Sequence, residues 1–528
     1  MGLTLESLCE GLGLTWEDIQ NTTASQKDIN RLELRHLDAK YPRVLDPINK
    51  ITGLMELSKD RLKISIEYVI ALSEIMQDYN GERRKIIDVK LTKKQKKLLR
   101  EIPKNFDYDN QLQIELIESI TKHDLAATTD WLKMKLLNEP EYGLQNYAEA
   151  VHWSLTSENI NGPCFALINK KIAYQILVPK LVEFEEMMVD LGEEYLSLPM
   201  IALTHGQTAE YTTFGKKCLN IASALDESLK KLIIRKDGEE IPFMFTASMM
   251  DAVGNLHDHY AAYPGINWRK KLDEIVESFG IEPLDMSDQC DSFLRYQTFA
   301  NIIDEFESTI RKRGNDFWEE IKDQLHDKKT KSGEKGSSVM AHKKNPWSLE
   351  GGLAIMGKGL AQLRYSFKTM RNYHQEGDMS RSILTRDIGD DYGKIVLGIS
   401  RIMREMKNYA PNLEKINENI NLNPSAATAP IMSTLKAIGI EGDMYREMQK
   451  LSQTKSIIKN QKSYIKGLEK LCDQYEIKSE DKKYLIGLVS PENNIKHIVE
   501  MGQDTIKKCR LTIDKIKLFY NMETKNGN

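Results

Sequence analysis

Long segments of this 528-residue chain place apolar side chains at steps of three and four residues. That spacing puts them on one face of an α-helix, whereas the alternation typical of strands is scarce. Glycines and the 15 prolines cluster between these segments, which leaves room for long helices. The clearest segments are residues 64–76, 114–137, 172–191, 214–233, 299–325 and 395–406. The sequence therefore predicts a mainly α protein whose long helices pack as a bundle or across subunits.

Three blocks can be distinguished along the chain. The first covers residues 1–148, and about its first thirty residues are predicted to be a weakly ordered extension of a helical domain. The second, residues 149–400, contains the longest helical patterns and is predicted to be a central bundle of long helices. The third, residues 401–528, is predicted to be a C-terminal helical domain.

Composition and charge narrow the class of protein. Hydrophobic residues make up 41% of the chain and the net charge is −4, so we expect a sizeable core and neither nucleic acid nor an anionic membrane as partner. Six cysteines in a chain of this length are few, which is typical of a reducing compartment. They include no C-x-x-C pair, and their spacing offers no zinc site. Since no signal peptide and no long apolar run is visible, we expect a cytoplasmic protein.

Residues 336–346 form the segment richest in chemistry. They read Gly-Ser-Ser-Val-Met-Ala-His-Lys-Lys-Asn-Pro, a polar composition between a glycine and a proline that predicts a loop. Loops carry catalysis more often than packing. A serine can act as a nucleophile or, less commonly, as a base. Lys343 and Asn345 could hold a carboxylate and stabilise the charge that develops on it.

Two histidine motifs could transfer protons. In Thr204-His205-Gly206 the glycine permits close approach of a substrate to the imidazole, although a His-Gly turn is more often structural. In Lys122-His123-Asp124 the carboxyl group could orient His123, but such a motif taken alone is more often a polar helix face. A third motif, His257-Asp258-His259, has no further strong ligand nearby, so we predict no metal there.

Two polar groups could bind anions. Thr156 and Ser157 could cap a helix, and the same hydroxyl and N–H groups would suit a carboxylate or a phosphate. Ser382 and Arg386 are four residues apart and share one face of a helix, where they could hold a phosphate or form an ordinary surface pair.

The loop resembles the signature G-S-x-x-M-x-x-K-x-N of the fumarase/aspartase superfamily. Gly336, Ser337, Met340, Lys343 and Asn345 occupy its fixed positions, and the resemblance runs from about residue 35 to about residue 500. Within the superfamily, segments 156–161 and 261–264 resemble the bacterial-type branch that cleaves adenylosuccinate. Segments 38–41, 122–124, 203–207 and 252–255 agree with that branch.

The resemblance implies a three-domain fold in which the central helices of a homotetramer form a core of twenty helices. Each active site would draw residues from three subunits. The implied reaction is β-elimination of fumarate from adenylosuccinate, giving AMP, and from the succinyl-carboxamide imidazole ribotide (SAICAR), giving AICAR. No cofactor is implied, because the nitrogen leaves as part of a stable amine. The implied partners are a small nucleotide substrate and other copies of the chain.

The resemblance also implies a role for each site residue. Ser337 would be the general base and His205 the general acid, while Lys343 and Asn345 would bind the succinyl carboxylate. Because a serine hydroxyl is a poor base, positive charge and N–H donors would have to stabilise its alkoxide. The other implied substrate-binding residues are Lys40, Tyr41, Lys122, His123, Asp124, Thr156, Ser157, Gln289, Arg381, Ser382 and Arg386. Of these, Lys40, Tyr41, Ser382 and Arg386 would hold the nucleotide end and its phosphate.

Three positions depart from the superfamily pattern. Ala341 stands where proline is usual, and Lys40 replaces an arginine, which keeps the charge but loses the bidentate geometry. Gly377 stands where a substrate-binding arginine is expected, and Arg381 is the obvious substitute.

Two other functions fit parts of the pattern. A sister lyase with another leaving group, such as one acting on argininosuccinate, would share the loop, but segment 156–161 argues against it. A non-catalytic tetramer would keep only the fold, and the presence of Ser337, His205 and Lys343 argues against that.

Overall fold

A computed structural model describes the chain over residues 4–25, 41–75, 77–79, 82–84, 90–329, 339–340, 342–453 and 460–522. These residues are mostly helical, which confirms the predicted fold class. Their contacts divide the chain into two compact units. Unit 1 comprises Met1–Val178, Phe243–Asp304 and Ile355–Leu397, and unit 2 comprises Pro179–Pro242, Glu305–Ala354 and Gly398–Asn528. The three-block division with boundaries at 148 and 400 stays a prediction.

Unit 1 is built around α5 (Leu54–Leu72), a helix that is buried on most of its faces. Leu62 and Ile64 are both fully buried although they point to nearly opposite sides of the helix, and α4, α8, α9 and α13 pack against it. The fully buried carboxylate of Asp60 on the same helix pairs with the Lys171 ammonium at 2.6 Å. Such a pair keeps the charge from being left alone in an apolar interior.

The remaining elements of unit 1 are mainly short helices. They are α1 (Leu5–Leu12), α2 (Trp16–Gln20), α4 (Pro42–Thr52), β1 (Gln77–Tyr79), β2 (Glu82–Arg84), α6 (Lys93–Glu101), α7 (Tyr108–Thr121), α8 (Asp124–Leu137), the 3₁₀ turns Pro140–Tyr142 and Leu144–Ala150, α9 (Ser157–Ile172), the π turn Ala173–Leu177, β7 (Thr246–Ala247), α12 (His257–Ala262), α13 (Trp268–Ser278) and β8 (Glu282–Pro283). Three long helices contribute residues to both units: α14 (Leu294–Lys322), α15 (Trp347–Met370) and α16 (Ser380–Lys407).

The segment 114–137 is two helices, so its prediction as one helical pattern is wrong. Helix α7 ends at Thr121, and Lys122 adopts a left-handed backbone with φ 57°. His123 then begins α8 by accepting a hydrogen bond from the Ala126 N–H at 3.3 Å. Apolar periodicity continues through this break because both helices bury the same kinds of side chain, whereas the break depends on one backbone angle.

The expectation of a weakly ordered N-terminal extension is wrong for the residues from 5 to 20. Helices α1 and α2 are each capped by a threonine, Thr4 and Thr15, whose side chain accepts a hydrogen bond from the first helical turn. The Ala24 N–H donates to the carboxylate of Asp109, which attaches the segment that follows α2 to α7. Capping of this kind stabilises even short helices by about 1 kcal/mol.

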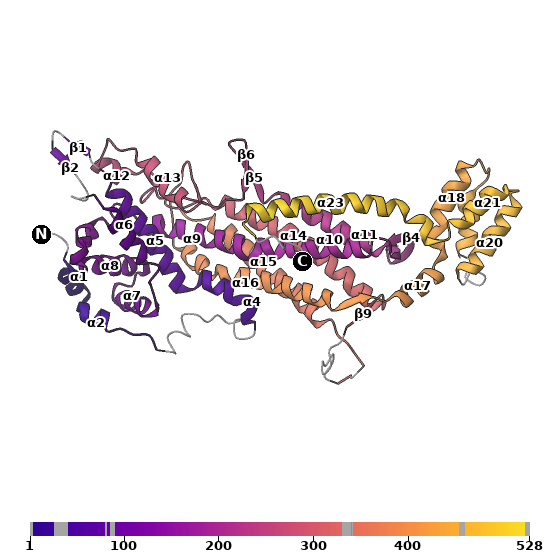
Figure 1. The fold of residues 1–528 in the computed structure, drawn as a ribbon, viewed down its shortest axis with the longest axis horizontal. Helices are drawn as coiled ribbons and strands as arrows, with labels where there is room; N and C mark the ends of the chain where they lie inside the picture. The colour runs from indigo at the N-terminus through magenta and orange to yellow at the C-terminus, as the bar shows by residue number, and fades with distance from the viewer. Residues whose placement is uncertain are drawn as a thin grey trace. The chain divides into compact units, whose positions relative to one another are not determined.

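Unit 2 combines long helices with a cluster of C-terminal helices (Figure 1). Its elements are α10 (Val178–Glu194), β3 (Pro199–Thr204), β4 (Gln207–Thr213), α11 (Phe214–Lys230), β5 (Ile233–Lys236), β6 (Glu239–Pro242), β9 (His326–Lys328), β10 (Tyr409–Pro411), α17 (Leu413–Leu422), the 3₁₀ turn Pro424–Ala427, α18 (Thr428–Ala437), α19 (Met444–Gln453), α20 (Gln461–Gln474), α21 (Ser479–Gly487), α22 (Pro491–Asn494) and α23 (Lys496–Phe519). One hydrophobic cluster joins the β3–β4 hairpin to the C-terminal helices, and Met200, Tyr211, Ile431 and Leu468 belong to it.

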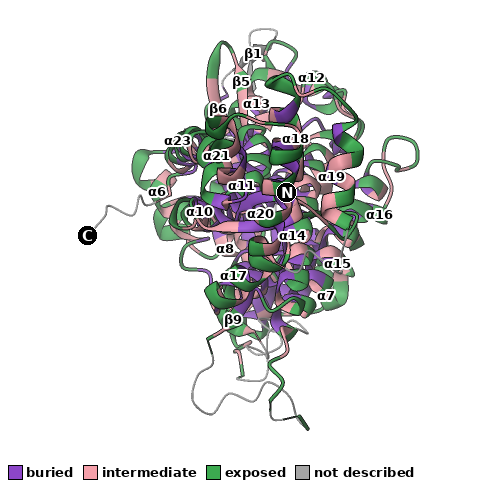
Figure 2. Cartoon of the chain, turned by 90° about the vertical axis from the view of Figure 1, so that its right-hand side faces the viewer, coloured by how far each residue is buried: buried purple, intermediate pink, exposed green. Residues whose placement is uncertain are grey.

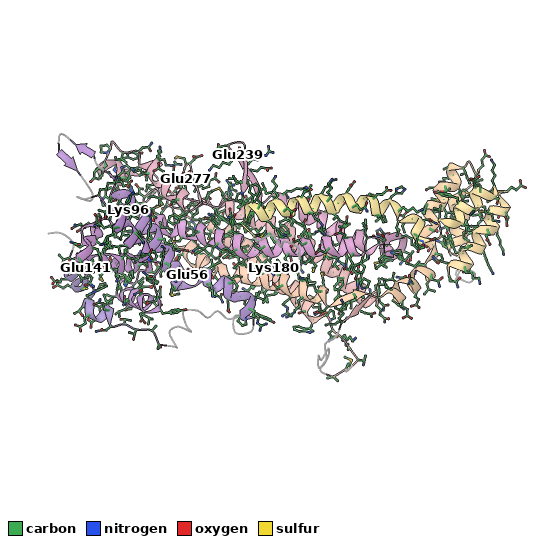
Figure 3. All side chains as sticks on the ribbon, viewed as in Figure 1. Glu56, Lys96, Glu141, Lys180, Glu239 and Glu277 are labelled. Atoms are coloured by element: carbon green, nitrogen blue, oxygen red, sulfur yellow. The ribbon has the colours of Figure 1, made fainter. Side chains whose placement is uncertain are left out.

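The C-terminal helix α23 runs back along α11 (Figure 1). Arg510 pairs with Glu193 of α10 at 2.5 Å, and the Tyr520 hydroxyl donates to the Leu232 carbonyl at 3.0 Å. Figure 2 shows buried residues, in purple, on helix faces that meet other helices. Exposed charges such as Glu141, Glu239 and Glu277 point outward (Figure 3). Over the described residues, no helix combines the length and apolarity needed to cross a membrane.

A buried carboxyl group in unit 2 makes stability depend on pH. Glu185 of α10 is fully buried beside Asp226 of α11 and Cys509 of α23. Burial, and then the neighbouring Asp226 carboxylate, raise the pKa of Glu185 to about 9. The folded protein therefore keeps this proton at pH values where the unfolded chain has released it. The stabilisation is complete at acid pH and is lost as the pH rises toward 9.

We expect Glu185→Gln to remove much of this pH dependence, because glutamine stays neutral. Between pH 5 and pH 8 the Glu185 carboxyl should lower the free energy of unfolding by up to about 4 kcal/mol. Denaturant titrations at the two pH values measure the difference. Glu183→Gln on the same helix is the matched control, since Glu183 is ion-paired to Lys180 and its pKa is lowered. A Glu185→Gln variant with the parental pH dependence would contradict this assignment.

Candidate functional site

A cavity of about 200 Å³ in unit 1 brings several of the predicted site residues together. Arg381, Ser382 and Arg386 line it from the first turns of α16, which confirms that Ser382 and Arg386 share a helix face. The other lining residues come from α4, α5, α9, the segment before α14, and α16: Thr52, Leu54, Leu57, Arg61, Glu158, Asn161, Gly162, Phe165, Ile168, Phe293, Thr385 and Ile388. One part of the wall is thus apolar and the other is strongly polar.

Positive charge dominates the polar wall. Asp124 Oδ2 accepts a hydrogen bond from Arg61 Nη2 at 2.7 Å and another from Arg386 Nη2 at 2.8 Å. Burial alone would raise the pKa of Asp124, but the two guanidinium groups outweigh it and hold this pKa well below its usual range. One carboxylate therefore neutralises two arginines only in part, which leaves charge in the wall for an anion.

Arg381 contributes a third guanidinium with unused donors. Its side chain is 3% exposed, and its nearest carboxylate oxygen, Glu158 Oε2, is 3.9 Å from Nη2. Among the described residues, its Nε and Nη1 atoms have no hydrogen-bond partner. The guanidinium carbon lies 5.2 Å from the centre of the Tyr373 ring. A buried guanidinium with free donors is costly unless an anion completes its hydrogen bonds.

Gly377 explains how Arg381 reaches the cavity wall. A Cβ atom at position 377 would lie 2.8 Å from Gln289 Oε1 and 3.4 Å from Arg381 Nη2. The end of the Arg381 side chain therefore lies beside the backbone of Gly377, the position at which the superfamily pattern has an arginine. Gln289 is held there by its backbone N–H, which donates to the Glu376 carbonyl at 3.1 Å. The predicted residues Gln289 and Arg381 thus lie side by side.

His123 lies close to Ser157, another predicted residue. The Nδ1 atom of His123 accepts from the Ala126 N–H, and its Nε2 atom lies 3.3 Å from the Ser157 hydroxyl. A neutral ring that accepts at Nδ1 carries its proton on Nε2, so His123 donates to Ser157 Oγ in that state. Both side chains retain exposure to solvent, as does Lys122. Asp124 Oδ1 is 3.8 Å from His123 Nδ1, while Oδ2 faces the arginines.

Thr156 is the N-cap residue of α9, as the polar segment 156–161 predicted. The Thr156 N–H donates to the Asn159 side chain at 2.9 Å, and Asn159 Nδ2 donates to the Asp251 carbonyl at 3.1 Å. This chain of bonds joins segment 156–161 to the residue just before segment 252–255, which also agrees with the resemblance. Ser157 and Glu158 make side-chain contacts of their own, Ser157 with His123 at 3.3 Å and Glu158 with Asn161 at 3.4 Å.

His205 belongs to unit 2, at the tip of the β3–β4 hairpin. His205 and Gly206 both have positive φ, 52° and 70°, which is the pattern of a two-residue type I′ turn. The turn leaves the imidazole exposed. The hairpin itself is anchored, because Thr208 donates to the Asn423 side chain at 2.8 Å and Tyr211 donates to the Val489 carbonyl at 3.0 Å. The His-Gly turn therefore has a structural role in the hairpin, and it also leaves the His205 side chain exposed to solvent.

Lys343 and Asn345 also belong to unit 2 and precede α15. Lys343 is exposed, and its N–H donates to the Met340 carbonyl at 3.0 Å. Asn345 is half-buried. Ser337 and Ala341 of the same segment lie outside the described residues, as does Lys40. Tyr41 stands directly before α4 as its N-cap residue. The roles of all these residues stay predictions.

Sequence reasoning missed Arg61, which connects three of the predicted motifs. Its Nε donates to Asn161 Oδ1 at 3.0 Å, and its Nη2 binds Asp124, which in turn binds Arg386. Arg61 is one of six charged residues in the segment 54–72, so nothing in the sequence distinguished it from the residues of a solvated helix face. Glu158 and Asn161 were also missed as cavity residues.

Comparison with known proteins supports a common ancestry. A protein-family model described as lyase matches residues 54–359, more than half of the chain. Adenylosuccinate lyase of Haemophilus influenzae is 26% identical over 89% of this chain and 97% of its own length. Adenylosuccinate lyase of Dictyostelium discoideum is 25% identical over 90% of this chain and 98% of its own length.

Solved structures share the fold at lower sequence identity. A fumarate lyase from Mesorhizobium sp. BNC1 has a TM-score of 0.65 at 12% identity and covers 88% of this chain and 97% of its own. Beta-carboxy-cis,cis-muconate cycloisomerase from Acinetobacter calcoaceticus has a TM-score of 0.64 at 13% identity, with the same coverage of the two chains. At such identities the likeness shows the fold alone.

Proposed function

Because the chain belongs to the lyase family, we propose that it releases fumarate from adenylosuccinate by β-elimination and leaves AMP. We extend the proposal to SAICAR, which would give AICAR by the same bond cleavage. The relatives named adenylosuccinate lyase support this choice, since the similarity covers nearly the whole length of both chains. The reaction belongs to purine nucleotide biosynthesis.

The observation that carries the proposal is the arginine-lined cavity of unit 1. Arg61, Arg381 and Arg386 line it together with the carboxylate of Glu158, and Asp124 binds Arg61 and Arg386. A nucleotide phosphate carries a charge close to −2, and several guanidinium donors beside the Ser382 hydroxyl suit such a group. The apolar part of the wall, with Phe165 and Phe293, suits the less polar part of a nucleotide.

The chemistry needs one base and one acid. In the proposal Ser337 removes a proton from the carbon next to a carboxylate, and the electron pair stays partly on that carboxylate. Lys343 and Asn345 stabilise this charge as it develops. The C–N bond then breaks, fumarate forms, and His205 gives a proton to the leaving nitrogen. The exposed tip of the β3–β4 hairpin allows His205 to meet a substrate.

We further propose that the protein acts in the cytoplasm as a homotetramer whose active sites are shared between subunits. The predicted residues are divided between the two compact units, with His123, Ser157 and Arg381 in unit 1 and His205 and Lys343 in unit 2. Sedimentation equilibrium measures the assembly, for which we expect a mass four times the 60.7 kDa of the chain.

One experiment decides between the candidate reactions. Purified protein is mixed with adenylosuccinate, and AMP and fumarate are followed by chromatography. We expect both products in equal amounts. In a parallel reaction the substrate is argininosuccinate, whose turnover in place of adenylosuccinate would replace the proposal with the sister lyase. Turnover of neither substrate would favour a tetramer without catalytic activity.

A further inference from the structure

The segment that carries the predicted catalytic loop is held at its first end by a short sheet. Strand β9 pairs with β10 in antiparallel register, with Lys328 opposite Tyr409. Immediately after the strand, the Lys329 N–H donates to the Asn408 carbonyl at 2.7 Å. The chain therefore leaves β9 from a fixed point beside the end of α16.

The second end of the segment is held by side chains of α16. The Arg404 Nη2 atom donates to the Ser348 hydroxyl at 2.6 Å, and Arg401 Nη2 donates to the Trp347 carbonyl at 3.3 Å. The Arg401 guanidinium also lies over the Trp347 ring, 5.1 Å from its centre. Both ends of the segment are thus attached to the same stretch of unit 2.

Lys328 joins the two ends directly. Its ammonium donates to the Glu405 carboxylate at 2.8 Å and to the backbone carbonyl of Asn345 at 3.2 Å. The Lys328 and Glu405 side chains are only 4% and 3% exposed. This ion pair is well removed from water. Removing one partner would be costly in stability, because the other would be left as a buried, unpaired charge.

We propose that Lys328 is a positioning residue that sets the backbone at Asn345, and with it the orientation of the Lys343–Asn345 stretch. The inference rests on the proposed function, in which this stretch binds a carboxylate. Lys328 does not touch the substrate in this scheme. It acts through the Asn345 carbonyl, and the ion pair with Glu405 fixes the position of its ammonium. Displacing a charge-stabilising amide by about 1 Å lowers kcat far more than it weakens substrate binding.

Three variants separate positioning from simple support of the fold. Lys328→Met removes the contact with Asn345 but leaves Glu405 buried and alone. Lys328→Met/Glu405→Gln removes the contact and both charges, which relieves that penalty. Lys517→Met/Glu186→Gln is the matched control, because it removes an ion pair between α23 and α10 in the same unit. Each variant is assayed for kcat and KM and for its unfolding temperature.

Hydrogen exchange of the backbone amides between residues 342 and 348, apart from Pro346, provides a readout that needs no activity. We expect faster exchange in both Lys328 variants and parental exchange in the control. We also expect kcat to fall by about 10- to 100-fold in both Lys328 variants, with a much smaller change in KM. The double variant should unfold near the parental temperature.

Two results would overturn the proposal. Parental kcat in the folded double variant would show that only the lone Glu405 charge had mattered. Unchanged exchange at 342–348 would show that Lys328 does not hold this stretch. If the parent protein releases no fumarate from adenylosuccinate, the proposed function fails, and the exchange measurement still decides whether Lys328 holds the segment.

Discussion

Replacing Ser337 by alanine is expected to lower kcat for fumarate release by about 1,000-fold or more, since general base catalysis contributes on that scale. In the proposed mechanism no other group of the loop accepts the proton. Alanine lacks the hydroxyl but keeps the backbone, so binding by Lys343 and Asn345 should persist. KM should therefore change little, and the assembly measured by sedimentation should stay intact.

The adjacent Ser338 provides a matched control in the same loop. Ser338→Ala removes the same group one residue away, and we expect it to keep most of the activity. Steady-state kinetics with adenylosuccinate compares the two variants directly. Near-parental turnover in Ser337→Ala would remove Ser337 from the role of base, and equal losses in both variants would point to loop structure instead.

The helical class could be predicted because apolar spacing reports burial along a whole segment. Of the predicted segment 299–325, residues 299–322 lie within α14, and residues 395–406 lie within α16. Breaks between helices are harder to predict, because the backbone angles of a single residue decide them. Lys122 ends α7 by taking a left-handed backbone conformation, which no feature of the apolar pattern marks. The same limit applies at Ile233, where the expected helix has already given way to β5.

Part of the candidate site could be predicted because its residues come in short motifs. Ser382 and Arg386 share a helix face by spacing alone, and both line the cavity. Arg61 could not be assigned in this way, since its partners Asp124 and Asn161 are 63 and 100 residues away in sequence. Such pairings depend on how α5, α8 and α9 pack together. Local propensity carries no information about that packing.

Replacing Arg381 by methionine is expected to raise KM for adenylosuccinate by about 100-fold, the size of effect expected when two charge-assisted hydrogen bonds are lost. Arg381 is buried, and its Nε and Nη1 atoms have no partner among the described residues. An anionic group of the substrate would complete these bonds. The free protein keeps a costly, incompletely bonded guanidinium ready for the substrate, which is a common exchange of stability for function.

That reasoning predicts opposite effects on binding and on stability. Arg381→Met should unfold at the parental temperature or above it, because methionine fills similar space without a charge to bury. Arg364→Met on α15 is the matched control, since Arg364 is half-exposed and pairs with Asp304 at 2.8 Å. It should leave KM unchanged. Thermal unfolding and steady-state kinetics on the same preparations measure both quantities. A parental KM in Arg381→Met would remove Arg381 from the binding residues, and a sharp fall in its unfolding temperature would assign the guanidinium to the fold.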